Sequence, residues 1–362
     1  MGWELAVLCG LGDTDRGTCA TPADSMPLNT PTQPETWRAW WVVGVLFPAH
    51  VLLGVLSMPF LIYSLLRLSP WAWAFAFAYA PFYLYPAQLR YPGWKGAEWI
   101  WRLFDYKTTC PSYFGSFGVH GGANVDRKQQ YFVACHPHGC VIFQRAFWRT
   151  PSLEGLFDRP WRMIGASALF RIPLVRELTL FFGAVDASRP NCERLLRNGC
   201  NIVLWPGGLD EANTSDDATS SQVTLRTRSG FVRLAVKHGA AVLPVFVFGE
   251  LDAVSAVPLL PKPLAAWLQR TMRISSNIFL GRYYTFIPSR VPFNMCIGKP
   301  VAVDPAAALA FEADPMAFEA EVRRVHAEYK QELRRLYEAN KARFGYEERA
   351  LVFACDEVKK SK

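Results

Sequence analysis

Two histidines separated by one residue are the strongest candidates for chemistry in this chain of 362 residues. They stand in the turn His136-Pro137-His138-Gly139, directly after the apolar run Tyr131–Cys135. Such a run is typical of a buried strand in a parallel sheet, and open α/β sheets form their active sites at the carboxyl ends of strands. Pro137 and Gly139 restrict the shape of the turn, so the pattern favours functional imidazoles over two structural histidines.

A second strand end carries glycines followed by acids. Asn201–Trp205 predicts a short buried strand, and the turn Pro206-Gly207-Gly208 follows it, with Asp210 and Glu211 next in the chain. A carboxylate beside an imidazole fixes its tautomer and stabilises the imidazolium ion that forms during proton transfer. Backbone N–H groups in a glycine turn can stabilise an oxyanion. Together the two strand ends predict a site for general acid–base chemistry.

Basic residues follow on a helix predicted over Val223–His238. Arg226, Arg233 and Lys237 are spaced close to one helical face, with Arg228 nearby. Alone, such a stripe is typical of a solvated helix face. After the two turns it favours a phosphorylated donor, and the donor with this profile is acyl-CoA, whose phosphates Arg and Lys would hold. The expected chemistry is acyl transfer from a thioester to a hydroxyl, with a neutral imidazole as general base.

The composition points to a lipid surface. The chain is 51% hydrophobic and 14% aromatic, and its formal net charge is +8. A basic and apolar chain favours a membrane face with anionic headgroups or a polyanionic small molecule, and no nucleic-acid recognition motif accompanies the charge. Nine scattered cysteines predict reduced thiols in a cytosol-facing protein. Cys135 and Cys140 flank the histidines, but neither belongs to a CxxC pair, which argues against a zinc site.

Three regions can be distinguished along the chain. Residues 1–36 are rich in Pro, Thr, Asp and Gly and predict a flexible tail. Residues 37–90 contain two apolar stretches, Trp40–Leu66 and Trp71–Leu89, which predict a membrane-embedded hairpin of two hydrophobic helices. Basic residues on both flanks of the hairpin place residues 91–362, the catalytic domain, in the cytosol. A buried helical hairpin and a wedge in one leaflet are the alternatives.

Residues 91–362 alternate strands with helices, which predicts an α/β sheet with crossover connections. Further strands are expected at Gly183–Val185, Ala241–Gly249 and Asn294–Val303, and a helix at Ser167–Phe182. A long charged helix follows, and its apolar stripe predicts core packing rather than a partner site. The stripe comprises Phe318, Val322, Val325, Tyr329, Leu333 and Leu336.

These motifs together resemble the type 2 diacylglycerol acyltransferase family, which includes monoacylglycerol and wax-alcohol acyltransferases. The resemblance rests on the His-Pro-His-Gly turn after a hydrophobic strand, on the Pro-Gly-Gly-x-x-Glu turn at Pro206–Glu211, and on the block Val223–Glu250. Ala168–Arg189 also resembles the wider glycerolipid acyltransferase superfamily, with Arg189 as a candidate substrate-binding residue. The likeness covers roughly Trp37–Lys341.

The resemblance implies a glycerolipid-acyltransferase-like sheet flanked by helices, and residence in the endoplasmic reticulum membrane or at lipid droplets. It carries the catalytic role over to the His-Pro-His-Gly turn, with His136 as the expected general base and His138 as the alternative. Glu211 is the expected partner acid, although Asp210 precedes it and Leu209 replaces the family's Ala.

Two further departures from the family pattern concern single positions near the turn. Cys135 stands where an aromatic residue usually precedes the first His, which implies a different pocket shape. Val141 occupies the place of the Asp that the wider superfamily carries five positions after its catalytic His, so the acid must come from elsewhere in the chain.

The sequence therefore predicts an acyl-CoA-dependent O-acyltransferase that acts on a membrane neutral lipid, with diacylglycerol as the expected acceptor and triacylglycerol as the product. Monoacylglycerol, a long-chain alcohol and a sterol are alternative acceptors. No cofactor or metal is expected beyond acyl-CoA as co-substrate, and homo-oligomerisation stays open. The candidate substrate-binding residues are Pro137, Gly139, Arg189, Pro206, Gly207, Gly208, Arg226, Arg228, Arg233 and Lys237.

Two readings from other classes compete with this one. A membrane thiol hydrolase would use Cys135 or Cys140 with a histidine, but Cys135 and His136 are consecutive and would point to opposite faces of a strand. A non-enzymatic lipid-droplet protein needs only the hairpin and the basic surface. It leaves the His-Pro-His-Gly turn without a purpose.

Overall fold

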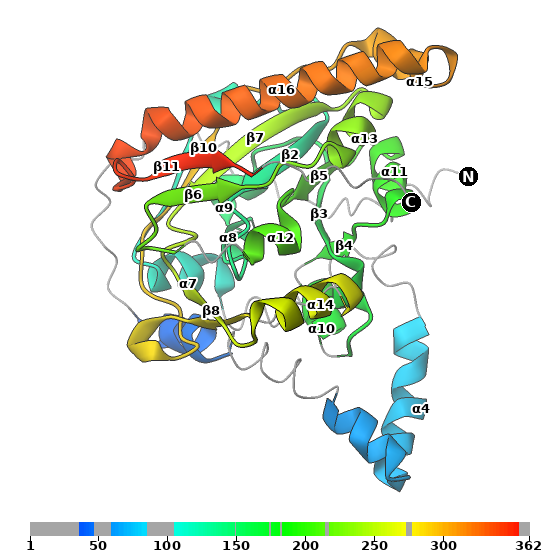
Figure 1. Cartoon of the computed structure of the whole chain (residues 1–362), viewed down its shortest axis with the longest axis vertical. Coiled ribbons are helices and arrows are strands. Elements are labelled where there is room, and N and C mark those ends of the chain that lie inside the picture. The colour runs from blue at the N-terminus through cyan, green and yellow to red at the C-terminus, as the bar shows by residue number, and fades with distance from the viewer. Residues whose placement is uncertain are drawn as a thin grey trace.

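The computed structural model describes residues 36–46, 59–84, 105–148, 150–173, 175–181, 183–213, 217–272 and 277–354. A seven-stranded sheet forms its centre, in the order β1-β10-β7-β2-β5-β3-β4 (Figure 1). Only β10 and β7 pair antiparallel among these neighbours, so the predicted α/β class is confirmed. The strands are β1 (Phe117–His120), β10 (Phe293–Ile297), β7 (Ala241–Phe248), β2 (Tyr131–His136), β5 (Asn201–Leu204), β3 (Trp161–Gly165) and β4 (Ala184–Asp186).

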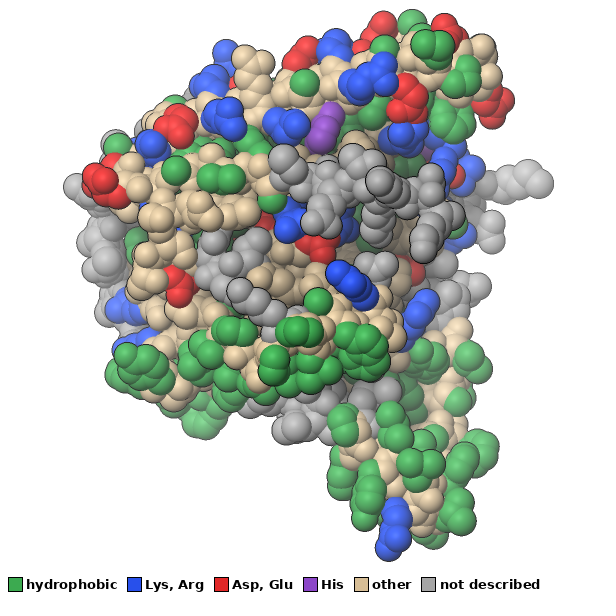
Figure 2. Space-filling model, viewed as in Figure 1, with side chains coloured by type: hydrophobic (Ala, Val, Ile, Leu, Met, Phe, Trp, Pro, Cys, Tyr) green, Lys and Arg blue, Asp and Glu red, His purple; other side chains and the backbone are tan. Residues whose placement is uncertain are grey.

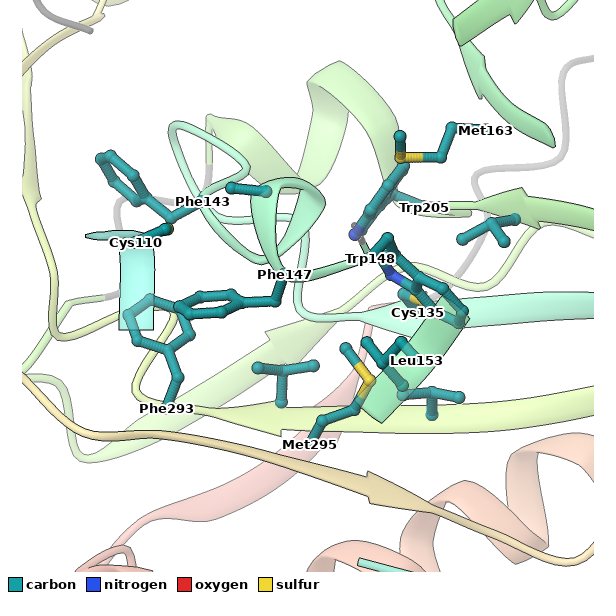
Figure 3. Close-up of a cluster of buried hydrophobic side chains, with 14 of the residues drawn as sticks. Cys110, Cys135, Phe143, Phe147, Trp148, Leu153, Met163, Trp205, Phe293 and Met295 are labelled. Atoms are coloured by element: carbon teal, nitrogen blue, oxygen red, sulfur yellow. The ribbon is translucent and has the colours of Figure 1, made fainter. Parts of the chain in front are cut away.

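Helices cover both faces of this sheet, and each face has its own hydrophobic cluster. One cluster includes side chains from α7 (Tyr106–Tyr113), α8 (Gln144–Phe147) and α9 (Pro151–Glu154), and Figure 3 shows Cys135, Trp148 and Trp205 gathered within it. The other cluster includes side chains from α11 (Arg189–Arg197), α13 (Gly230–His238), α15 (Pro305–Ala313) and α16 (Pro315–Asn340).

Strand β2 contributes to both clusters because its side chains alternate between the two faces. Tyr131, Val133 and Cys135 lie in the first cluster, and Phe132 and Ala134 lie in the second. The next residue, at the carboxyl end of β2, therefore points towards the face that α16 covers. Every residue of the predicted apolar stripe of α16 is buried there, which confirms its role in core packing.

The predicted helix over Val223–His238 was wrong in its first half. Residues Gln222–Leu225 form strand β6, which pairs parallel with β11 (Ala350–Phe353), and α13 begins only at Gly230. The partner of β6 lies more than a hundred residues further along the chain, so a helical spacing of apolar residues in this segment could not reveal it. Gly239 ends α13 in a left-handed conformation.

Two other predicted elements have different bounds. The stretch Ser167–Phe182 is divided into η3 (Ser167–Phe170) and α10 (Val175–Phe181), because Pro173 lies between them. The last predicted strand ends at Ile297. Beyond it, Val301 forms a single bridge with Val242. A smaller sheet pairs β8 (Ser255–Pro258) with β9 (Asn277–Leu280), and α14 (Lys262–Met272) connects them.

The N-terminal apolar region contains short helices. They are α2 (Trp37–Ala39), η1 (Trp40–Leu46), a helix over residues 59–66 and α4 (Pro70–Leu84). The last two form a hairpin in which the rings of Phe60 and Trp71 stack with their centroids 5.6 Å apart. Among the helices in the described ranges, none combines the length and apolarity needed to cross a bilayer. Residues 47–58 and 85–104 and the predicted tail up to residue 35 lie outside the described residues, so the spanning hairpin and the tail stay predictions.

Candidate active site

Three strand ends meet at one edge of the sheet. Strand β2 pairs in parallel with β5 on one side and with β7 on the other, so the segments that follow these strands lie together. These segments are the His-Pro-His-Gly turn after β2, the turn Pro206–Gly208 that leads into α12 (Gly208–Ala212) after β5, and Gly249-Glu250 after β7. This edge brings together both predicted turns and an acid that the sequence did not single out.

The ring of His136 is fully buried and has a protein group near each nitrogen. Its Nε2 lies 2.6 Å from the hydroxyl oxygen of Tyr329 on α16. Its Nδ1 lies 3.5 Å from Oε2 of Glu211, and the exposed fraction of the side chain is 0%. The neutral tautomer that fits both neighbours carries its proton on Nδ1 towards the carboxylate and accepts at Nε2 from the Tyr329 hydroxyl. The ring therefore joins α16 to α12.

The ring of His138 is only partly buried, and its Nδ1 is occupied by a backbone group. Nδ1 lies 2.8 Å from the carbonyl oxygen of Gly139, so it carries the proton and donates it to that oxygen. The lone pair of the neutral ring is then on Nε2. Burial lowers the pKa of His138, while the carbonyl of Gly139 and the charge of Glu211 oppose that shift. The ring of His138 is therefore a neutral imidazole whose basic nitrogen, Nε2, does not bond to the Gly139 carbonyl.

Glu211 lies between the two histidines and binds the backbone of both surrounding segments. Its Oε1 accepts the backbone N–H of His138 at 2.5 Å, and its Oε2 accepts that of Arg226 at 3.1 Å. Burial raises the pKa of this carboxyl, but the interaction with the His136 ring and the two backbone donors outweigh burial, so its pKa lies below the usual value. Glu211 is therefore ionised at neutral pH although it is only 3% exposed.

The first glycine of the turn after β5 makes room for that carboxylate. A Cβ at Gly207 would collide with the side chain of Glu211. Gly208 is left-handed, with φ of +55°, and its backbone N–H already donates to the carbonyl of Trp205 at 3.2 Å. The predicted oxyanion role of this turn therefore has no support from Gly208, and Gly207 instead has a steric role.

Glu250 holds the other side of the His-Pro-His-Gly segment. Its two carboxyl oxygens accept the backbone N–H groups of Phe143 and Gln144 at 2.6 and 2.9 Å. The side-chain amide of Gln144 donates in turn to the carbonyl of Pro137 at 2.6 Å. Gly139, at φ +65°, would bring a Cβ to 3.4 Å from Cγ of Glu250. The turn is thus fixed from one side by Glu211 and from the other by Glu250.

A family model described as diacylglycerol acyltransferase matches residues 65–354 of the chain. The chain belongs to the diacylglycerol acyltransferase family. The match confirms the resemblance that the two turns and the block Val223–Glu250 carry. The histidines, Glu211 and Glu250 all lie inside the matched residues.

Relatives with different acceptors in their names match this family member at similar identity. The human 2-acylglycerol O-acyltransferase 3 is 29% identical over 352 residues, which are 88% of this chain and 95% of that protein. Diacylglycerol O-acyltransferase 2B of Umbelopsis ramanniana is 31% identical over 234 residues, 60% of this chain. The human acyl-CoA wax alcohol acyltransferase 2 is 28% identical over 282 residues, 68% of this chain and 82% of that protein.

The alignments do not extend over the whole of every relative. The chain spans 65% of the Umbelopsis ramanniana protein and 64% of diacylglycerol O-acyltransferase 2 of Dictyostelium discoideum. A crystal structure of a 1-acyl-sn-glycerophosphate acyltransferase from Thermotoga maritima matches 77% of this chain and 97% of that chain, at 18% identity and a TM-score of 0.36. A score this low carries no argument about the fold of this family member.

The predicted basic stripe does not exist as one helical face. Arg226 and Arg228 lie in the loop before α13, where the Arg228 guanidinium pairs with Asp210 beside the site. The other two residues of the stripe, Arg233 and Lys237, lie on α13 and pair with acids on neighbouring helices, and Arg189, a further predicted substrate-binding residue on α11, pairs with an acid on its own helix. Arg233 pairs with Glu319, and Arg189 and Lys237 both bond to Glu193 at 3.0 Å. The family member therefore has two basic groups on the loop at the turn and a separate group on α11 and α13.

Asp210 is not the acid that faces the histidines. Its Oδ1 accepts the side-chain amide of Gln269 on α14 at 2.7 Å, and its Oδ2 accepts from Arg228. Glu211, the preferred acid of the sequence motif, makes the contacts with His136 and with the backbone of His138.

The cysteines beside the histidines have the properties of structural thiols. Burial raises the pKa of Cys140 to about 11 and holds that of Cys135 well above its usual value. Cys135 lies in the cluster on the opposite face of β2 from His136, as the alternation along a strand predicts. Both thiols are therefore protonated at neutral pH, which argues against a thiolate nucleophile.

Sequence reasoning missed two residues that hold the site. Tyr329 had been assigned to the apolar stripe of α16, and it is the one member of that stripe with a hydroxyl group. Glu250 follows the buried strand β7 after one glycine, Gly249, as Glu211 follows the glycine turn after β5. An acid at the carboxyl end of a buried strand was therefore a signal that could have identified Glu250.

Proposed function

We propose that the chain is an acyl-CoA-dependent O-acyltransferase that esterifies diacylglycerol to triacylglycerol, with His138 as the general base. The observation that carries this proposal is the neutral, partly exposed ring of His138, whose Nδ1 donates to the Gly139 carbonyl and whose lone pair is on Nε2. Family membership supports acyl transfer as the reaction.

In this mechanism Nε2 of His138 accepts the proton of the acceptor hydroxyl as its oxygen attacks the thioester carbonyl carbon. The tetrahedral intermediate collapses with cleavage of the carbon–sulfur bond, and the CoA thiolate takes the proton back from the imidazolium. The negative charge of Glu211 favours the protonated ring of His138 in the intermediate state. No covalent acyl-enzyme is formed, and the products are an ester and CoA.

His136 takes a positioning role in this proposal instead of the base role that the sequence alone favours. Both of its nitrogens face protein groups, Tyr329 on one side and Glu211 on the other, and the ring is fully buried. It keeps Glu211 ionised and in place, and Glu211 in turn holds the backbone of His138. Arg226 and Arg228, next to the turn, are the proposed contacts of the CoA phosphates.

Location and acceptor are part of the same proposal. The exposed aromatic residues of α4 and the apolar stretches of residues 37–90 support a position at the endoplasmic reticulum membrane or on lipid droplets, with the catalytic domain in the cytosol. Monoacylglycerol and a long-chain alcohol are alternative acceptors, because relatives with 2-acylglycerol and wax alcohol in their names match the chain. A sterol is the remaining alternative from the sequence.

The test offers labelled oleoyl-CoA to the purified protein in detergent, together with diacylglycerol, monoacylglycerol, a long-chain alcohol and a sterol. Labelled triacylglycerol that disappears in a His138→Gln variant supports the proposal. Another labelled ester would change the acceptor, and free labelled fatty acid as the only product would indicate a hydrolase. If folded protein gives no product, the reading as an enzyme is wrong, and a non-enzymatic lipid-droplet role takes its place.

A further inference from the structure

The segment around α14 exposes large hydrophobic side chains to solvent. Leu264 and Trp267 on α14 are 47% and 57% exposed, and Val257 and Leu259 just before the helix are 38% and 58% exposed. Single exposed apolar residues are ordinary on a protein surface, but four within eleven residues of chain form a patch that calls for an apolar partner.

The charge of this segment identifies the kind of partner. Between Ser255 and Arg273 the chain carries Lys262, Arg270 and Arg273 and no acid. Apolar side chains with a Trp on one face of a helix, with Lys and Arg as the only charges, are typical of a helix that lies in the plane of a membrane interface. An anionic lipid surface satisfies both features, because its headgroups attract the basic residues and its acyl chains receive the apolar ones.

The position of α14 agrees with such a surface. Figure 2 shows hydrophobic side chains gathered along one edge of the body over α14, on the side of the molecule from which α4 projects. The hairpin that includes α4 is itself apolar on its outside, with Trp71 52% and Phe77 72% exposed. The hairpin is fixed to the body through Tyr79, whose hydroxyl donates to Glu177 on α10 at 2.5 Å. Two exposed apolar surfaces therefore share one side of the molecule.

The helix is also joined to the candidate active site. The side-chain amide of Gln269 on α14 donates to Asp210 at 2.7 Å, and Asp210 precedes Glu211 on the short helix α12. A lipid surface that holds α14 would therefore lie beside the segment that carries the partner acid of the histidines.

We propose that α14 is a second lipid-contacting element, separate from the N-terminal hairpin, which lies flat in the interface of an anionic membrane. Leu264 and Trp267 enter the acyl-chain region, and Arg270 contacts the headgroup phosphates. The proposal concerns lipid binding only, so its test does not depend on the acyl-transfer reaction.

The direct test places a photo-crosslinking amino acid at position 267 in the full-length protein. The protein is bound to vesicles of phosphatidylcholine and labelled phosphatidylserine and then irradiated. The matched control carries the same amino acid at position 309, where Leu309 on α15 is 84% exposed on another part of the molecule (Figure 1). We expect a labelled lipid adduct from position 267 and none from position 309. Equal lipid adducts from both positions, no lipid adduct from position 267, or an adduct between two copies of the chain would overturn the proposal.

A second measurement does not depend on the crosslinker. The double variant Leu264→Ser, Trp267→Ser removes two exposed anchors, so it should keep the fold, and its helical circular dichroism is the check. Its partition into phosphatidylserine-containing vesicles should fall at least about tenfold, because the loss of even one large apolar anchor is expected to cost about that much and the variant lacks two. Leu309→Ser should partition like the wild type. Wild-type partition of the double variant would show that the hairpin alone binds the membrane.

Discussion

Two buried carboxylates hold the His-Pro-His-Gly turn of this acyltransferase family member from opposite sides, and they differ in charge. Glu211 and Glu250 are 3% and 1% exposed, and each accepts two backbone N–H groups. The pKa of Glu211 is nevertheless lowered, whereas burial holds the pKa of Glu250 well above its usual value. Similar hydrogen bonds thus leave one carboxyl ionised and the other prone to protonation.

The difference between the two sites is the ring of His136. It lies 3.5 Å from Glu211 and favours the ionised form of that carboxyl. Glu250 has the charge of Arg145 nearby, but this charge and the backbone donors do not overcome burial. Buried backbone donors therefore fix the shape of the turn, while the histidine next to Glu211 keeps that carboxylate ionised.

In the comparison of the two carboxylates, the largest effect is expected from neutralising Glu211. Glu211→Gln keeps the size of the side chain but removes the charge, and its NH2 group would face a backbone donor. We expect the rate of acyl transfer to fall about 10²- to 10³-fold, because the imidazolium loses its stabilising charge and the turn loses an acceptor. The control is Asp210→Asn, which keeps an acceptor for Gln269 and should lose far less activity. Equal losses in the two variants would remove the distinction between the acids.

The next effect concerns the space that the charged carboxylate needs. Gly207→Ala places a Cβ against Glu211, so we expect the free energy of unfolding to fall by about 3 kcal/mol and activity to fall with it. Gly208→Ala puts a side chain at positive φ in open space and should cost only about 1 kcal/mol. Thermal and denaturant unfolding of both variants, with acyl-transfer rates, gives the comparison. A cost for Gly208→Ala as large as that for Gly207→Ala would contradict the steric role.

Changes at Glu250 should affect the free energy of unfolding. In Glu250→Gln one oxygen acceptor is replaced by an NH2 group that meets the backbone N–H of Phe143 or Gln144. We expect a loss of about 2 kcal/mol in the free energy of unfolding, the cost of a buried group without its partner. Differential scanning calorimetry in detergent measures it. A variant as stable as the wild type would mean that the hydrogen bonds of Glu250 to Phe143 and Gln144 do not hold the turn.

The smallest effect is in the pH dependence of the free energy of unfolding, where Glu211 and Glu250 should act in opposite directions. The lowered pKa of Glu211 means that its contribution to the free energy of unfolding is present above the unfolded value near 4.5 and is lost as pH falls through the folded pKa. The raised pKa of Glu250 has the opposite consequence. Its contribution to the free energy of unfolding is present below the unfolded pKa of 4.5 and is lost as pH rises through the folded pKa. The difference between wild type and Glu211→Gln should therefore shrink in acid, and that between wild type and Glu250→Gln should shrink towards neutral pH. Melting experiments at several pH values measure both differences. If the two differences changed with pH in the same direction, the contrast between Glu211 and Glu250 would be refuted.

The sequence predicted the strands and turns of the site better than the roles within it. Strands β2 and β5 and the stripe of α16 follow local patterns of apolar residues, and they were predicted correctly. Strand β6 was mistaken for a helix because its partner β11 lies more than a hundred residues further along the chain. The proposed exchange of roles between His136 and His138 rests on the burial of the His136 ring by Tyr329 of α16. These two residues are 193 positions apart in the chain. Periodicity carries no information about such contacts.

The measurement that tests the central proposal most directly is the pH profile of acyl transfer in His136→Gln and His138→Gln beside the wild type. Burial lowers the pKa of His138, so the wild-type rate should fall with acid only below about pH 6.5, as the base becomes protonated. We predict that His138→Gln loses about 10²- to 10⁴-fold in rate at neutral pH and no longer shows this acidic limb. His136→Gln should keep the limb at a reduced rate. A His138→Gln enzyme that retains the limb, beside a His136→Gln enzyme that has lost it, would return the base to His136 and contradict the account.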